Sequence, residues 1–347
     1  MLIRTVSVCL SAVAVALGCV AQPAAPATLS AAAPFPVGAA LNPGRLANDA
    51  RYRETAAREF NSVTAENHLK MHHVHPDKDR YDWSGGDALV TFAQQTGKRL
   101  HGHTLLWHEA IPGWVKSFEG DSTAWEALVR EHIQTVMRHY EGRIPAWDVV
   151  NEVFLDDGTW RPSLWRTKLG PDYVARLFRY ARAADPAVKL FYNDYGQEYS
   201  PRKLDALLAM VADFKRRGIP IDGIGLQMHT HIDQPIETIE NALRRVAATG
   251  LLVHISELDV RINPKGAPAF TPTDAHWQRQ QAQFTAIARA YRTLVPPAQQ
   301  YGITTWNVGD GDSWIPKFCK CPDFPLPFDA NYAKKPAYAG FLTGLRP

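Results

Sequence analysis

The feature that most constrains the fold is a regular alternation of short apolar segments with longer amphipathic segments of helical period. Alternating strands and helices favour a parallel sheet, and eight such units in one chain favour a closed barrel. A chain of 347 residues is long enough to form one such barrel as a single domain. We therefore predict an α/β fold, a single-domain (β/α)8 TIM barrel over residues 37–347. The expected strands are 37–41, 62–65, 99–106, 146–151, 189–193, 223–228, 252–258 and 302–307.

The segments between these strands carry helix signals. Ser122 is the expected N-cap of one helix, and Gly97, Gly218 and Gly250 stand where helices are expected to end. The expected helices are 87–95, 122–140, 172–184, 203–217, 236–249 and 274–294.

The N-terminal segment is typical of a signal peptide. Arg4 supplies a positive charge, a run rich in small apolar residues follows, and Ala21 is a suitable cleavage residue. The run is short for a membrane span. We expect a signal peptide over 1–21, a flexible Ala/Pro-rich leader over 22–36, and export to the periplasm or the extracellular space. A lipoprotein site at Cys19 is the alternative, although the residue three positions earlier is not leucine.

Composition narrows the class of partner. The formal net charge of +3 is too small to favour a nucleic acid or an anionic membrane. The chain has ten tryptophans, several of them near acidic residues and histidines rather than in apolar runs. Flat aromatic faces suit sugar binding, although each tryptophan could equally be a packing residue. We expect a monomer, with no transmembrane segment once the signal peptide is removed.

Polar and aromatic residues gather at the carboxyl ends of the expected strands. In a TIM barrel the active site is built at that face, by the loops that follow the strands. One polar strand end would mean little, but a series of them in register is difficult to explain as packing. The candidate site residues are Glu66, Asn67, Lys70, His103, Trp107, Asn151, Glu152, Gln227, His229, Glu257, Asp259, Trp306 and Trp314.

Two glutamates among them match the needs of glycosidic cleavage. That reaction uses one carboxylic acid to protonate the leaving oxygen and one carboxylate to attack the anomeric carbon or direct water to it. Glu152 has uncharged neighbours, which favour a raised pKa and a proton-donating role. Strand alternation places Glu257 and Asp259 on one face, where Asp259 can orient His229 and His229 can keep Glu257 ionised. Salt bridges at strand ends are the structural alternative for each glutamate taken alone.

Two H-x-H pairs suggest a competing chemistry. His101 with His103, and His229 with His231, each share a strand face, a spacing that can chelate a metal in a hydrolase barrel. Such sites usually take their first pair from the first strand, which has no histidine here. We therefore expect no metal and no other cofactor, with His101 and His231 making local hydrogen bonds or facing loops.

Seven segments together resemble glycoside hydrolase family 10, the (β/α)8 endo-β-1,4-xylanases. They are TAENHLK at 64–70, GHTLLWH at 102–108, WDVVNE at 147–152, NDY at 193–195, GIGLQMH at 223–229, SELD at 256–259, and GITTW at 302–306 with SW at 313–314. Their order and spacing make the resemblance specific, and it extends from about Phe60 to Pro336.

The resemblance implies a role for each candidate residue. Glu152 resembles the general acid/base, and Glu257 the nucleophile of a retaining mechanism. The residues that resemble glycone-side xylose contacts are Glu66, Asn67, Lys70, His103 and Trp107. Asn151 resembles the ligand of the sugar 2-hydroxyl, Gln227 and His229 the contacts around the nucleophile, and Trp306 and Trp314 an aromatic floor and wall. The implied substrates are xylan and xylo-oligosaccharides.

Three segments depart from the family pattern, at 71–76, 307–312 and 319–327. The last contains Cys319 and Cys321, which can form a strained disulfide across one residue. A retaining β-1,4-glucanase or mannanase of similar barrel architecture stays open as an alternative. A non-catalytic carbohydrate-binding protein is disfavoured because both glutamates are present.

Overall fold

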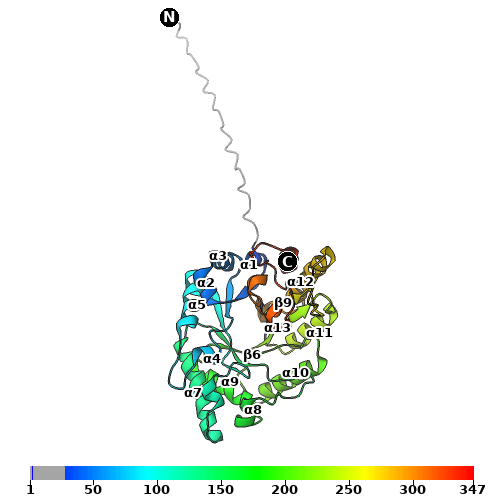
Figure 1. The fold of residues 1–347 in the computed structure, drawn as a ribbon. Coiled ribbons are helices and arrows are strands. Elements are labelled where there is room, and N and C mark those ends of the chain that lie inside the picture. Colours follow the sequence, from blue (N-terminus) through cyan, green and yellow to red (C-terminus); the bar gives the residue numbers. More distant parts are fainter. Residues whose placement is uncertain (1, 3–27) are drawn as a thin grey trace.

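The computed structural model describes residue 2 and residues 28–347 (Figure 1). The expected signal peptide therefore lies outside the described residues except for Leu2, and so does the proposed lipid attachment site at Cys19. In the described part of the chain, no helix combines the length and apolar character that crossing a membrane would require.

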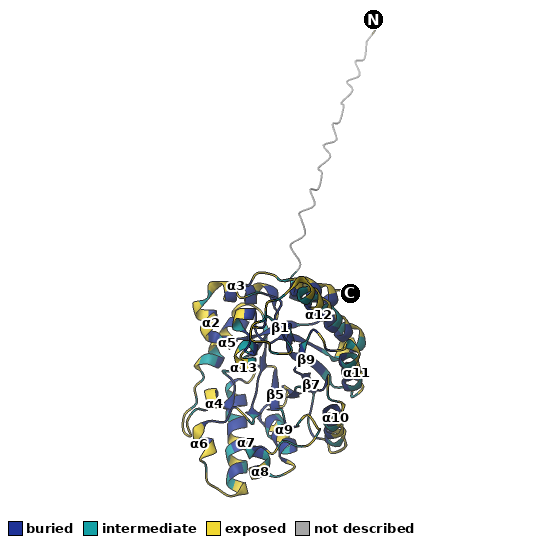
Figure 2. Ribbon diagram, turned by 45° about the vertical axis from the view of Figure 1, so that its right-hand side comes forward, coloured by how far each residue is buried: buried dark blue, intermediate teal, exposed yellow. Residues whose placement is uncertain are grey.

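A closed barrel of parallel strands forms the centre of the molecule, as the alternating pattern predicts. Pairing between the last two barrel strands, together with pairing of the first strand to the last, closes the ring (Figure 1). The strands of the ring are β1 (Val37–Leu41), β2 (Ser62–Ala65), β3 (Arg99–Gly102), β5 (Ala146–Asn151), β6 (Lys189–Asp194), β7 (Gly223–Leu226), β9 (Leu252–Arg261) and β10 (Gln300–Thr305). The strands are almost wholly buried, and the exposed residues lie on the surrounding helices and loops (Figure 2).

Two expected strands are interrupted near their carboxyl ends. The expected strand 99–106 divides into β3 and the short β4 (Leu106–Trp107), which pairs with β5. The expected strand 223–228 ends at Leu226, and β8 (His229–His231) resumes beside β9. Both breaks lie at the mouth of the barrel, where the chain turns side chains into the opening.

Helices surround the barrel, and the six expected ones are all present with boundaries shifted by a few residues at most. The helices are α1 (Leu29–Ala32), α2 (Pro43–Asn48), α3 (Ala50–Glu59), α4 (Met71–Val74), α5 (Ser84–Gln95), α6 (Gly113–Lys116), α7 (Ser122–His139), α8 (Leu164–Leu169), α9 (Tyr173–Ala184), α10 (Pro201–Arg216), α11 (Ile236–Ala247), α12 (Asp274–Leu294), α13 (Ile315–Cys319) and α14 (Pro336–Leu345). The helical pattern of α3 is weak because its buried face is sparse, and α3 was therefore not predicted. Its only buried residues are Tyr52, Thr55, Ala56 and Glu59.

The N-cap prediction for α7 is wrong by one residue. Asp121, not Ser122, lies before the first turn, and its carboxylate accepts a hydrogen bond from the backbone N–H of Ala124 at 2.9 Å. Both residue types cap well, and the spacing alone did not distinguish them. The glycines expected at the C-terminal ends of helices are as predicted. Gly97, Gly218 and Gly250 all have positive φ, a conformation that costs glycine little energy.

The described part of the expected flexible leader packs against the barrel, which corrects that prediction for residues 28–36. The Thr28 hydroxyl caps α1, and Leu29 is fully buried with its N–H donating to Glu59 at 3.3 Å. Phe35 is buried too, and its ring lies edge-on to Tyr291 at 4.9 Å. An Ala/Pro-rich composition suggests flexibility, but two large apolar side chains are enough to fix this segment.

Candidate active site

A cleft of about 650 Å³ lies at the carboxyl ends of the strands. Every expected catalytic and substrate-binding residue lines it, and Asp259 is buried behind His229. The lining consists of Glu66, Asn67, Lys70, His103, Trp107, His108, Glu109, Asn151, Glu152, Arg161, Tyr195, Tyr199, Gln227, His229, Glu257, Arg261, Trp306, Trp314, Ile315 and Phe318.

Glu257 lies on β9, buried and surrounded by donors and positive charge. Its Oε2 is 3.3 Å from His229 Nε2, and its Oε1 accepts a hydrogen bond from Asn193 Nδ2 at 2.8 Å. Burial raises the pKa of the Glu257 carboxyl, but the hydrogen bond from His229 and the charges of His103, His229 and Lys70 outweigh it. The net pKa of Glu257 is lowered, so this group is held as a carboxylate.

His229 links Glu257 to Asp259. Its Nδ1 is 2.8 Å from Asp259 Oδ2, and the Trp314 indole N–H donates to the same oxygen at 3.1 Å. Burial lowers the pKa of His229, but the carboxylates of Asp259 and Glu257 raise it by more than burial lowers it. The net pKa of His229 lies well above its usual value. An imidazolium between two carboxylates therefore orients Glu257, which is the arrangement expected from strand alternation.

Glu152 follows the end of β5 in an uncommon backbone conformation. Its φ of 58° lies in the left-handed region, which few non-glycine residues adopt. The Glu152 N–H donates to the Asn193 carbonyl at 3.0 Å, and Arg161 Nε donates to the Glu152 carbonyl at 3.0 Å. Strained conformations of this kind persist where the surroundings fix them, and they cluster at functional sites.

The pKa of Glu152 is raised, chiefly because burial disfavours its charged form. The hydrogen bond from Gln227 opposes the rise, and Glu257 adds to it. One carboxyl held protonated and one held ionised in the same cleft suit an acid and a nucleophile.

Amide side chains connect the two glutamates. Asn193 Nδ2 donates both to Glu257 Oε1 and to Asn151 Oδ1, the latter at 3.0 Å. Asn151 Nδ2 in turn donates to Glu152 Oε1 at 3.2 Å. The Gln227 side chain donates to Glu152 Oε1 at 3.0 Å, whereas its contact with Glu257 is only through the backbone. Gln227 therefore contacts both glutamates, Glu152 through its side chain and Glu257 through its backbone carbonyl.

Lys70 and two aromatic rings form one wall of the cleft. Lys70 Nζ donates to Asn67 Oδ1 at 2.9 Å and lies 4.8 Å from the Trp107 ring centroid and 5.7 Å from that of Trp306. Burial lowers the pKa of Lys70, and nearby glutamates oppose that effect. Glu66 is positioned by a hydrogen bond from Asn42 Nδ2 at 3.3 Å. This wall presents ammonium, amide and carboxylate groups to one end of the cleft, which suits the hydroxyls of a sugar.

The first H-x-H pair holds a buried aspartate. His101 Nε2 is 3.0 Å from one oxygen of Asp148, and His103 Nδ1 is 2.9 Å from the other. The expectation that His101 faces a loop or bonds locally is wrong: His101 is buried inside the barrel and pairs with Asp148 on the neighbouring strand. His231 Nδ1 accepts from the Asp233 N–H at 3.2 Å, which is a local contact as expected. Within residues 28–347, no three His, Cys, Asp or Glu side chains are grouped to hold a metal ion.

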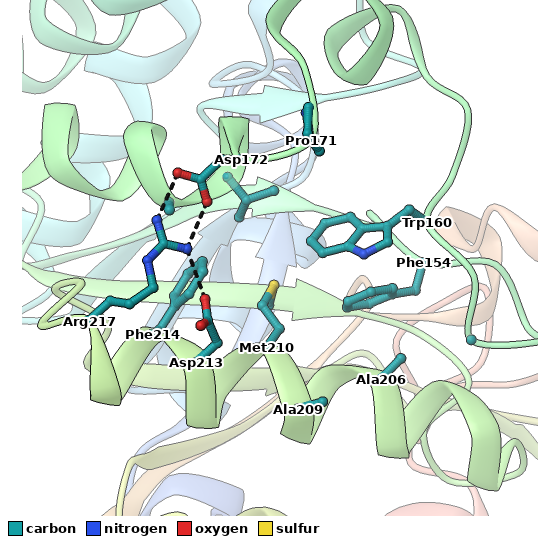
Figure 3. Close-up of a pocket in the computed structure, with 13 residues that line it drawn as sticks. Phe154, Trp160, Pro171, Asp172, Ala206, Ala209, Met210, Asp213, Phe214 and Arg217 are labelled. Carbon is teal, nitrogen blue, oxygen red and sulfur yellow. Dashed lines mark hydrogen bonds and ion pairs between the residues drawn. The ribbon is translucent and has the colours of Figure 1, made fainter.

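A second cavity, of about 300 Å³, lies away from the carboxylate pair, beside α9 and α10 (Figure 3). Phe154, Trp160 and Met210 contribute apolar walls. Its charged groups are already matched, because Arg217 binds Asp172 at 2.7 Å and Asp213 at 2.8 Å. The chemistry of the molecule therefore lies in the larger cleft.

Several residues in or beside the cleft were given no role from the sequence. Asn193 contacts Glu257 directly, and its place in the NDY segment at 193–195 was the available signal. Arg161 Nη2 donates to the Tyr195 hydroxyl at 3.1 Å, which joins two loops at the rim. Phe318 lies outside the seven motif segments and directly before the departing segment 319–327, so nothing in the motifs indicated its place.

A parallel (β/α)8 barrel with two neighbouring carboxyls of opposite pKa shift at its mouth defines the class of the glycoside hydrolase barrels. The family model described as glycosyl hydrolase family 10 matches residues 27–343. The chain belongs to this family.

Two curated relatives are similar to the chain over most of its length. Endo-1,4-beta-xylanase A of Cellvibrio japonicus is 36% identical over 91% of the chain, and endo-1,4-beta-xylanase B of Thermotoga neapolitana is 36% identical over 83% of it. The chain spans 56% of the first relative and 81% of the second. Among solved structures, a Cellvibrio japonicus xylanase 10C mutant in complex with xylopentaose superposes with a TM-score of 0.87 at 35% identity. That superposition covers 92% of this chain and 69% of the other.

Proposed function

We propose that this protein is an endo-1,4-β-xylanase that hydrolyses internal bonds of xylan with retention of anomeric configuration. The observation that carries the proposal is the pairing of Glu152 and Glu257 in one cleft, where Asn151 and Asn193 link them by hydrogen bonds. The pKa is raised for Glu152 and lowered for Glu257, as an acid and a nucleophile require. The relatives named endo-1,4-beta-xylanase support the choice of substrate.

In the first step, the Glu257 carboxylate attacks the anomeric carbon while Glu152 donates its proton to the leaving glycosidic oxygen. The bond from the anomeric carbon to that oxygen breaks, and a covalent glycosyl ester on Glu257 forms. His229 and Asn193 fix the two oxygens of Glu257, so the attacking carboxylate is oriented before substrate arrives.

In the second step, Glu152, now a carboxylate, takes a proton from water, and that water attacks the anomeric carbon. The ester bond breaks, Glu257 leaves as a carboxylate, and two inversions give net retention. Loss of the Glu257 negative charge in the intermediate lowers the pKa of Glu152, because the like charge that had raised it is gone. The same residue thus serves as acid and then as base.

Selectivity for xylan over glucan and mannan would come from aromatic side chains that close over the C5 substituent of the sugar. Trp306 and Trp314 both line the cleft beside the carboxylate pair, and an added hydroxymethyl group would meet them. Exclusion of so small a group is worth about 1–3 kcal/mol. Glucan is the second candidate substrate. It is supported by a relative named exoglucanase XynX from Acetivibrio thermocellus, which is 33% identical over 88% of the chain.

Initial rates on glucuronoxylan, carboxymethylcellulose and mannan test the proposal, with products followed by proton NMR. We expect xylan to be the best substrate and the first product to be the β-anomer. Dominant glucan cleavage would favour the second candidate, and an α-anomer would contradict retention. Full loss of activity on treatment with EDTA would contradict a metal-independent mechanism.

We also propose that the protein is exported and acts as a monomer. The support for export is the signal-like segment 1–21, and the mass of the mature N-terminus in a native host tests it: cleavage after Ala21 is expected, and a lipidated Cys19 would identify a lipoprotein instead. Sedimentation velocity tests the monomer.

A further inference from the structure

Exposed aromatic side chains are concentrated in the cleft. The large apolar side chains with high exposure among the described residues are Leu2, Tyr199 and Phe318, the last at 70%. Both of the aromatic ones line the cleft. A large apolar ring left in water is a feature that needs an explanation when it borders a binding site.

Phe318 extends a row of rings, His229 and Trp314, that begins beside Glu257. Its ring centroid lies 4.9 Å from that of Trp314 at an interplanar angle of 50°, and Trp314 lies 5.0 Å from His229. A continuous series of contacts therefore runs from the Phe318 ring through Trp314 and His229 to Glu257. α13, the orange helix inside the ring of outer helices in Figure 1, carries Phe318.

The backbone that follows Phe318 is anchored. A disulfide joins Cys319 and Cys321, the residues that flank Lys320 at the end of α13. Two residues further on, the buried Asp323 carboxylate accepts hydrogen bonds from the Ile262 N–H at 2.9 Å and from Arg261 Nε at 3.0 Å. Because the segment is tied to the end of β9, holding the Phe318 ring in place costs little additional conformational entropy.

We propose that Phe318 is a stacking platform for a xylosyl residue of the polysaccharide backbone, beyond the sugars at the catalytic pair, and that the Cys319–Cys321 disulfide positions it. A pyranose ring presents a flat face of C–H bonds that packs on an aromatic ring, and burying that face removes the exposed Phe318 surface from water. This inference rests on the proposed function and concerns how far along the chain the cleft holds its substrate.

The test compares a long with a short substrate. Phe318→Ala should lower kcat/KM on xylohexaose by about tenfold, the loss expected for one stacked ring, and leave kcat/KM on an aryl β-xylobioside unchanged, because the short substrate does not reach the platform. Phe318→Trp should keep the wild-type ratio of the two rates. Lys317→Ala, on the same helix but outside the cleft, should change neither rate.

The outcomes separate this inference from the proposed function. Equal losses on both substrates would mean that Phe318 supports Trp314 instead of binding sugar, which would overturn the inference. If wild-type enzyme cleaved cellohexaose and not xylohexaose, the proposed function would fail, and the same comparison on cellohexaose and an aryl cellobioside would decide the role of Phe318. A dimer that dissociates in Phe318→Ala, with unchanged kinetics, would assign the ring to contact between copies and would also overturn the inference.

The positioning role of the disulfide is tested separately. The double variant Cys319→Ser/Cys321→Ser should lower kcat/KM on xylohexaose selectively, by less than Phe318→Ala, because the ring stays present but is less well fixed. The two changes should not add fully when combined with Phe318→Ala, since both act on one contact. Full additivity would contradict a positioning role for the disulfide.

Discussion

His229 Nε2 lies 3.3 Å from Glu257 Oε2 and gives the nucleophile a positively charged neighbour that is itself held by a second carboxylate. Removing that second carboxylate tests the arrangement. In Asp259→Asn, the pKa of His229 should fall, because Asp259 raises it, and the pKa of Glu257 should rise in consequence. Since Glu257 must be ionised, the acid limb of the kcat/KM profile should move to higher pH, with a loss of about 1–3 kcal/mol in transition-state binding. A pH–rate profile with an unmoved acid limb would contradict this role.

The wild-type pH profile follows from the two opposite shifts. Activity needs an ionised Glu257, so it falls as pH drops through the lowered pKa of that residue. It also needs a protonated Glu152, so it falls as pH rises through the raised pKa of that residue. We expect a bell with a broad plateau, measured as kcat/KM on an aryl β-xylobioside.

Replacing Gln227 should change only the alkaline limb of this bell-shaped pH profile. Its side-chain N–H donates to Glu152 Oε1 and lowers the pKa of Glu152, against the effect of burial. In Gln227→Leu the pKa of Glu152 should therefore rise, and the alkaline limb should move to higher pH. The acid limb serves as an internal control and should stay in place.

Replacing the nucleophile should abolish turnover but leave a site that an added anion can fill. Glu257→Ala should lower kcat by about 10⁴-fold or more, and azide should restore part of the rate and give a product of the opposite anomeric configuration. Glu257→Gln is the matched control, because its amide occupies the space that azide needs. Near-normal rates in Glu257→Ala would show that the nucleophile is misassigned.

Replacing the acid should have an effect that depends on the leaving group. In Glu152→Ala, kcat/KM on xylan should fall by about 10²–10⁴-fold, the usual worth of general acid catalysis. A dinitrophenyl β-xylobioside needs no protonation of its leaving group, so its kcat/KM should fall far less. Equal losses on the two substrates would contradict the assignment of Glu152 as the acid.

Asn193 should contribute to catalysis through the hydrogen bonds that its side-chain Nδ2 donates. Asn193→Ala removes the hydrogen bonds to Glu257 Oε1 and Asn151 Oδ1, and we expect a loss of about 1–3 kcal/mol in transition-state binding. Ser256→Ala is the matched control: it removes the hydroxyl that donates to Asn193 Oδ1 at 2.6 Å and leaves the donor to Glu257 in place. Thermal unfolding of both variants separates loss of activity from loss of fold.

The sequence alone was enough to predict the barrel, the closeness of the candidate residues and the two glutamates. The reason is that these properties depend on local pattern and on one general rule. Alternating strands and helices close into a parallel barrel, and the carboxyl ends of all its strands then meet at one face. Alternation along β9 likewise predicted that Glu257 and Asp259 would share a face with His229 between them.

Only the tertiary structure decided the partners across strands and loops. Gln227 serves Glu152 because the side chains at the mouth converge from several strands, and spacing within one strand does not give distances to another. His101 is buried against Asp148 because β3 lies beside β5. Burial, the first cause of the Glu152 shift, is a property of the whole assembled barrel. The place of Phe318 depends on a disulfide and on the contacts of Asp323 with β9, which no local pattern specifies.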